Sequence, residues 1–194
     1  YPASHTVAGA REALMGSLAR LRTRYLDLYM LHSPAPSVAI RHETWKQLVL
    51  FKREGLVRTI GVANFGLREL RELVAFSSER PEALMNKFSV YHPGARRNPA
   101  GDDLLGYAKA EGILLVAYCP LNAWPSALGA VHDLHVRHIA ARIKRTPAQV
   151  LLRWAVQQGV AVLTRSSSDE RLAEATLVHE FTLSEADMAL LSGL

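Results

Sequence analysis

The segment YLDLYMLHSP, residues 25–34, contains a short apolar run that ends at a histidine and at a loop-forming Ser-Pro pair. A run that is apolar nearly throughout is typical of a strand covered on both faces of a parallel sheet. Four further runs of this kind follow along the chain, at residues 57–63, 84–90, 113–118 and 160–164. Their starts lie roughly 30 residues apart, the length of a βαβ unit, except for a longer last interval. The alternation of short strands with longer amphipathic stretches predicts an α/β fold with a parallel sheet.

The stretches between these strands have the features of helices. In residues 7–21, apolar side chains recur at the helical period. The sequence TPAQ at residues 146–149 offers a capping threonine, a proline suited to the first helical position and a glutamine that closes a capping box. SSDE at residues 167–170 predicts a second box with Ser167 as the cap, and SEAD at 184–187 starts the last helix. Glycines between a helix and the next strand predict left-handed caps at Gly55, Gly112 and Gly159.

The composition excludes several classes of protein. The chain has a formal charge of +5, but its basic residues are scattered and no aromatic residues interleave with them, so nucleic-acid binding is not predicted. No apolar run approaches the ~20 residues that span a bilayer. The single cysteine, Cys119, allows no internal disulfide and fits a reducing compartment, which predicts a cytoplasmic protein. The chain begins with neither Met nor the features of a signal peptide, so we expect a processed or incomplete chain. The histidines at positions 132, 135 and 138 drift around a helix by about 60° per step, so no metal site is predicted.

Polar side chains follow the predicted strands at the ends where barrels keep their active sites. His32, Asn64 and Tyr118 each end an apolar run. Alone, such a histidine is more often structural, and such an asparagine is more often a turn residue or a cap. The sequence TRSSSDER, residues 164–171, places two arginines around a serine-rich helix start, and both features favour phosphate. A Rossmann site is not predicted, because no G-x-G-x-x-G follows a strand.

The order of these motifs resembles the aldo-keto reductase family over residues 7–194. The matching segments are L-D-L-Y-x-x-H-x-P, G-V-x-N-F, V-A-Y-x-P-L and the final T-R-S…E-R-L, and residues 86–94 are similar to a subgroup of the family. The resemblance implies a single domain, residues 1–194, that is a partial (β/α)8 TIM barrel. About five of the eight parallel strands are expected here with their outer helices, and the first strands are missing.

The resemblance also implies roles for particular residues. His32 corresponds to the active-site histidine, which polarises the carbonyl oxygen of the substrate. Asn64 corresponds to the residue that binds the nicotinamide carboxamide, and Tyr118 to the tyrosine that stacks on the nicotinamide ring. The remaining cofactor contacts are Cys119 and Leu121 along the pyrophosphate, Arg165, Ser166 and Arg171 around the adenosine 2′-phosphate, and Glu174 near the adenine. A 2′-phosphate site implies NADPH as the cofactor.

The sequence departs from the family pattern at three neighbouring positions and at its start. Ala63 stands where a serine is usual, Met85 lies near the usual nicotinamide-binding glutamine, and Ala175 replaces an asparagine near the adenine. The family's catalytic tyrosine, aspartate and lysine lie on earlier strands and are absent from this chain.

These departures leave the function open between different classes of protein. The first is an oxidoreductase that uses NADPH to reduce an aldehyde or ketone, with this chain alone inactive or weakly active. The second is a non-catalytic cofactor-binding or regulatory barrel, and the third is a fragment of an incomplete gene without independent function. The expected partners are a small carbonyl compound and a protein that completes the open sheet. The sequence decides neither the substrate nor the oligomeric state.

Overall fold

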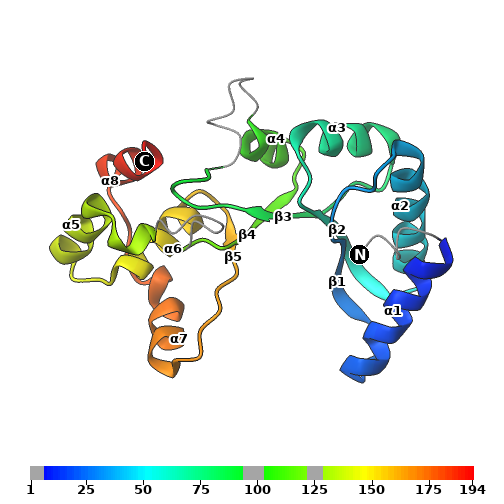
Figure 1. The fold of residues 1–194 in the computed structure, drawn as a ribbon, viewed down its shortest axis with the longest axis horizontal. Helices are drawn as coiled ribbons and strands as arrows, with labels where there is room; N and C mark the ends of the chain where they lie inside the picture. Colours follow the sequence, from blue (N-terminus) through cyan, green and yellow to red (C-terminus); the bar gives the residue numbers. More distant parts are fainter. Residues whose placement is uncertain (1–6, 94–102, 122–128) are drawn as a thin grey trace. The chain divides into compact units, whose positions relative to one another are not determined.

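The computed structural model describes residues 7–93, 103–121 and 129–194 (Figure 1). Contacts divide the chain into two compact units. The first unit comprises residues 1–85 and 110–113, and the second comprises residues 86–109 and 114–194. In chain order, the first unit contains α1 (Val7–Leu21), β1 (Leu26–Leu31), α2 (Val38–Arg53), β2 (Val57–Ala63), α3 (Leu67–Phe76) and the start of β3 (Ala83–Lys87). The second unit contains the end of β3, α4 (Leu104–Ala110, as far as residue 109), β4 (Leu114–Tyr118), η3 (Ala130–His132), α5 (Leu134–Ile143), α6 (Pro147–Gln157), β5 (Ala161–Val162), α7 (Asp169–Thr176), η4 (Leu177–His179) and α8 (Glu185–Ser192).

The strands are parallel and follow one another in the sheet in chain order, β1-β2-β3-β4-β5. In the first unit, Leu26 of β1 pairs with Val57 of β2, and the register continues to Leu31 and Val62. β2 pairs in turn with β3, from Gly61 with Ala83 onward. In the second unit, β4 pairs with β5 at Val116–Ala161 and Ala117–Val162. The five predicted strands are therefore confirmed as a parallel α/β arrangement.

The strands are not buried equally. β2 is buried at five of its seven positions, and Ile60 in its middle is fully buried. On β1, in contrast, Leu28 is 37% exposed and only Leu31 is buried. A strand at the end of a sheet has one side without a neighbouring strand, which is the position that β1 holds.

Each unit has its own apolar core. In the first unit, α1 and α2 lie side by side in Figure 1, and Trp45, Leu48 and Phe51 on α2 are buried. In the second unit, the rings of Phe88 and Trp154 stack with centroids 5.2 Å apart, and both side chains are fully buried. Burial of one such side chain stabilises a fold by about 1.5–3 kcal/mol.

Most helix boundaries follow the predicted signals. α1 has the predicted bounds, the box of Thr146 and Gln149 is complete, and Ser184 caps α8. Gly55, Gly112 and Gly159 have φ values of 73°, 70° and 73°, as a left-handed cap requires.

The prediction for the start of α7 is wrong by one residue. Ser168, not Ser167, is the cap, and its hydroxyl accepts a hydrogen bond from the Arg171 amide. Two strands are also shorter than predicted. β3 ends at Lys87, because Ser89 and His92 exchange backbone hydrogen bonds in a turn, and β5 contains only Ala161 and Val162.

Among the described residues, no group of histidine, cysteine, aspartate or glutamate side chains could hold a metal ion. No helix in the described ranges is long and apolar enough to cross a membrane.

Candidate functional site

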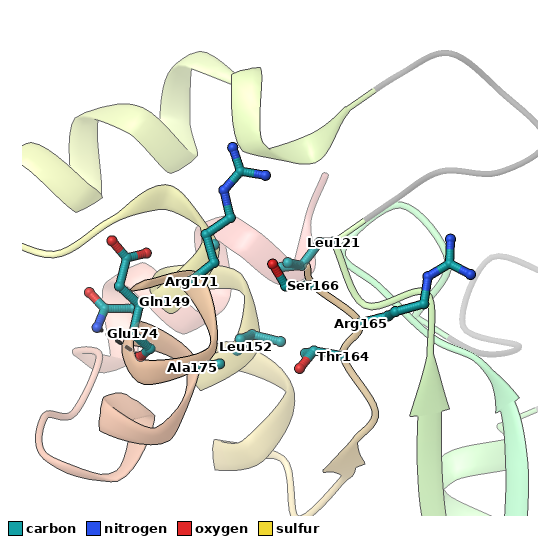
Figure 2. Close-up of a pocket in the computed structure, with 10 residues that line it drawn as sticks. Leu121, Gln149, Leu152, Thr164, Arg165, Ser166, Arg171, Glu174 and Ala175 are labelled. Atoms are coloured by element: carbon teal, nitrogen blue, oxygen red, sulfur yellow. Dashed lines mark hydrogen bonds between the residues drawn. The ribbon is translucent and has the colours of Figure 1, made fainter. Parts of the chain in front are cut away.

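A pocket of about 200 Å³ lies at the start of α7 in the second unit (Figure 2). Its wall is formed by residues from the loop after β4, from α6, and from the β5–α7 loop with the first turns of α7. The lining residues are Leu121, Ala148, Gln149, Leu152, Thr164, Arg165, Ser166, Arg171, Glu174 and Ala175. The structure therefore brings together four residues that the sequence assigned to the adenosine end of a dinucleotide, Arg165, Ser166, Arg171 and Glu174, with Leu121, which it assigned to the pyrophosphate.

The serine-rich turn before α7 is held by its own hydrogen bonds. The Ser166 hydroxyl oxygen accepts from the Ser168 amide at 3.0 Å, and the Ser168 hydroxyl accepts from the Arg171 amide at 3.3 Å. These bonds fix the loop against the first turn of the helix. Amide groups at a helix start carry partial positive charge, which favours an anion, whereas the carboxylates of Asp169 and Glu170 in the same turn oppose it.

Two exposed guanidinium groups add full positive charge to this turn. Arg165 and Arg171 are both exposed, and Figure 2 shows them extending outward from the loop and from α7. In the described part of the chain, neither forms an ion pair with a carboxylate. A guanidinium has a planar fork of donors that matches phosphate oxygens.

The opposite wall of the pocket is rigid, because α6 and α7 are joined by hydrogen bonds. The side chain of Gln149 is buried and its Nε2 donates to the Glu174 carbonyl at 3.0 Å, as the dashed line in Figure 2 marks. The Thr146 hydroxyl donates to the Glu174 carboxylate at 3.2 Å. The capping box of α6 therefore also positions Glu174 at the pocket.

A second pocket, of about 490 Å³, lies beside the first at the carboxyl end of β4. Tyr118 and Cys119 line it, and Leu121, Thr164 and Arg165 line both pockets, so the two are adjacent. Cys119 has a φ of 54°, a left-handed conformation that is uncommon for a residue with a Cβ. It turns the chain sharply as β4 ends and leaves Tyr118 half-buried at the rim.

Lys87 is a candidate site residue that the sequence analysis missed. It ends β3 and is half-buried. The Phe88 amide donates to the Tyr118 carbonyl at 3.3 Å, which in a parallel pair sets Lys87 opposite Tyr118. The signal that could have found it is a charged residue two positions after the apolar sequence ALM, residues 83–85.

In the first unit, the structure brings His32 and Asn64 together. His32 follows β1 and is exposed, and Asn64 follows β2 in a left-handed conformation with a φ of 60°. Asn64 Nδ2 donates to the His32 carbonyl at 2.7 Å. Asn64 therefore holds the backbone of the histidine, a role that the sequence did not predict.

His32 also borders a cavity of about 240 Å³ between α1, β1 and α2, together with Arg20 and Tyr29. Burial raises the pKa of the Tyr29 phenol, and the nearby charge of Arg20 opposes that rise. The phenol of Tyr29 is therefore neutral at physiological pH.

The structure also describes the three positions at which the sequence departs from the family pattern. Ala63 is buried and pairs with the half-buried Met85 in the sheet, and Ala175 lines the first pocket.

A parallel α/β fold with a pocket and polar side chains beyond the strand ends is the arrangement found in barrel-type proteins. A model of the aldo/keto reductase family matches residues 1–194, and the chain belongs to this family. The fold is that of a partial TIM barrel. A crystal structure of an aldo/keto reductase from Brucella melitensis has a TM-score of 0.89 with the chain at 27% sequence identity, covering 100% of the chain and 70% of that protein.

Curated relatives give the same family. An uncharacterized oxidoreductase of Caenorhabditis elegans is 36% identical over 187 residues, which cover 93% of this chain and 54% of the relative. An NAD/NADP-dependent indole-3-acetaldehyde reductase of Schizosaccharomyces pombe is 34% identical over 188 residues, which cover 95% of this chain and 64% of the relative. Aldo-keto reductase family 1 member A1 of Sus scrofa is 32% identical and also covered to 64%. The chain thus spans between 54% and 64% of the length of these relatives.

Proposed function

We propose that the chain binds NADPH in the two adjacent pockets of the second unit and serves the reduction of an aldehyde or ketone. The observation that carries the proposal is the first pocket, where two arginines and a hydroxyl surround a helix start. In this proposal, Arg165, Ser166 and Arg171 bind the 2′-phosphate of the adenosine. Selection of NADPH over NADH follows, because only NADPH carries that phosphate.

The donor set and the shape of the pockets fit this cofactor. The first pocket combines phosphate-binding groups with the apolar side chains of Leu152 and Ala175, as a nucleoside with a phosphate requires. The second leads from Leu121 along Cys119 to Tyr118, whose ring would stack on the nicotinamide. When bound, the cofactor supplies the hydride that reduces the carbonyl carbon.

The resemblance to the family also implies a role for His32, which lies in the first unit. In the proposal, the exposed imidazole of His32 hydrogen-bonds the carbonyl oxygen of the substrate and draws electron density from its carbon. The bond from Asn64 to the His32 carbonyl fixes the backbone from which this imidazole projects. The resemblance implies a tyrosine as the proton donor, on a strand earlier than those of this chain. We therefore propose cofactor binding with turnover of a reactive aromatic aldehyde well below ~1 s⁻¹, the low end of ordinary enzymes.

The decisive experiment is a fluorescence titration of the chain with NADPH and with NADH. We expect tighter binding of NADPH, and we expect Arg171→Ala to weaken NADPH roughly tenfold, since a charge-assisted hydrogen bond contributes about 1.5–3 kcal/mol and this side chain is exposed. The affinity for NADH should be unchanged in that variant. Arg137→Ala, which removes an exposed arginine of α5 in the same unit, is the matched control. Equal affinities of the parent chain for both cofactors would refute the proposal.

A further inference from the structure

Lys87 carries a positive charge at the carboxyl end of β3, where the chain leaves the sheet. The strand begins with the apolar sequence ALM at positions 83–85, in which Ala83 and Leu84 are buried, and Asn86 separates this sequence from Lys87. The side chain of Lys87 is half-buried. It lies in the second unit, as do the pockets of the proposed cofactor site.

The pairing of β3 with β4 places Lys87 next to Tyr118. The hydrogen bond from the Phe88 amide to the Tyr118 carbonyl sets Lys87 and Tyr118 directly opposite each other in the register. Opposite residues of neighbouring strands project from the same face of a sheet, and their backbones are about 4.8 Å apart. A group stacked on the Tyr118 ring would therefore lie within reach of the Lys87 stem.

A turn of the chain holds the ammonium group of Lys87. Lys87 Nζ lies 3.3 Å from His92 Nε2, so the ammonium donates and the imidazole nitrogen accepts. His92 is in turn fixed, because its amide donates to the Ser89 carbonyl at 2.9 Å and its carbonyl accepts from the Ser89 amide at 3.1 Å. The lysine is thus anchored at its tip as well as at its backbone.

We infer that Lys87 makes the site discriminate between the two redox states of the cofactor, favouring the reduced one. The inference rests on the proposed function, in which the nicotinamide stacks on Tyr118. The ring of NADP⁺ is positively charged and that of NADPH is neutral, while the phosphates of the two are identical. A fixed ammonium beside the ring repels only the oxidised form, so it weakens NADP⁺ and leaves NADPH almost unaffected.

The magnitude follows from Coulomb's law. Two unit charges about 6 Å apart change an affinity roughly threefold in water and roughly a hundredfold at an effective dielectric constant of 20. The rim of an open pocket lies between these limits. We expect Lys87 to raise the ratio of the NADP⁺ and NADPH dissociation constants about tenfold.

The test is calorimetric titration of the parent chain and three variants with both cofactors. Lys87→Met should lower the dissociation-constant ratio about tenfold, chiefly by tightening NADP⁺. Lys87→Arg, which keeps the charge, should retain the parent ratio. Lys109→Met removes an exposed lysine from α4 of the same unit, so it repeats the substitution and the change in net charge, and it should leave the ratio unchanged.

The outcomes separate the two proposals. If Lys87→Met binds both cofactors with the same ratio of dissociation constants as the parent, the inference is overturned and the proposed function is left intact. A ratio that falls equally in Lys109→Met also overturns it, since the effect would then come from net charge. If the folded parent binds neither cofactor, the proposed function fails, and the inference fails with it.

Discussion

Replacement of Glu72 by glutamine should destabilise the first unit and loosen the loop that follows His32. Glu72 on α3 binds two side chains of α2. Its carboxylate accepts from Arg41 Nε at 2.7 Å and from Arg41 Nη2 at 2.5 Å, and its other oxygen contacts His42. Arg41 Nη1 donates to the Ala35 carbonyl at 3.3 Å. Glu72 thus fastens, through Arg41, the loop that begins at His32.

The expected cost follows from the exposure of the two partners. The Arg41 side chain is only 7% exposed, so loss of its carboxylate leaves a nearly buried cation without a counterion. Removing one partner of a fully buried pair costs about 3–5 kcal/mol, whereas an exposed pair contributes at most about 1 kcal/mol. Because Glu72 itself is 26% exposed, water can partly replace it. We expect Glu72→Gln to lower the free energy of unfolding by about 2 kcal/mol.

Urea unfolding followed by circular dichroism measures this change, and hydrogen exchange reports the loop. The amides of Ser33 and Ala35 should exchange faster in the variant. Glu43→Gln is the matched control, because the pair of Glu43 and Lys46 has side chains 58% and 56% exposed, and its loss should cost less than about 0.5 kcal/mol. A cost for Glu72→Gln no larger than that of the control would refute the reasoning and show that water solvates Arg41.

Two further predictions concern the edge of the sheet and the dependence of stability on pH in acid. Ile60→Ala, at a fully buried site on β2, should lower the free energy of unfolding by about 3 kcal/mol. Leu28→Ala, at a site 37% exposed on β1, should lower it by about 1 kcal/mol. Equal losses in chemical denaturation would show that another surface covers β1 in solution. Burial raises the pKa of Asp187, but the Ser184 hydroxyl and the Arg142 guanidinium together outweigh it and hold the pKa below its usual value of 3.8. The resulting stabilisation is present above that pH and is lost as the pH falls through the folded-state pKa, so the stability difference between the parent and Asp187→Asn should shrink below about pH 4. A difference in urea midpoint that is constant down to pH 2 would contradict this assignment.

The features that the sequence predicted well depend on neighbouring residues. The bounds of α1 and the box of Thr146 and Gln149 follow from local periodicity and capping, and both are confirmed. The cap of α7 was misplaced because adjacent serines offer the same hydroxyl. Ser168 becomes the cap in the folded turn, where its amide also donates to Ser166.

The features that the sequence did not reveal depend on residues far apart in the chain. The apolar run of residues 84–90 suggested a strand to its end, but Phe88 and Val90 are buried beyond the strand. The resemblance assigned Asn64 to the nicotinamide carboxamide, which stays a prediction, and the structure adds that its Nδ2 bonds the carbonyl of His32, 32 positions away. The strand register that sets Lys87 opposite Tyr118 is likewise a property of the sheet and has no local signature.

Three basic residues of the chain have distinct roles at the proposed site. Under the proposed function, Arg165 and Arg171, which line the first pocket, bind the phosphate end of the cofactor, whose negative charge is the same in both redox states. They then act on overall affinity and on the choice of NADPH over NADH. Under the further inference, Lys87 lies at the ring end, where the charge changes with the redox state, and acts on the ratio of the two dissociation constants. One substitution at each end therefore separates these contributions. Because the two charges act on different groups of the ligand, the ratio set by Lys87 should persist even where Arg171→Ala has weakened binding of both redox forms.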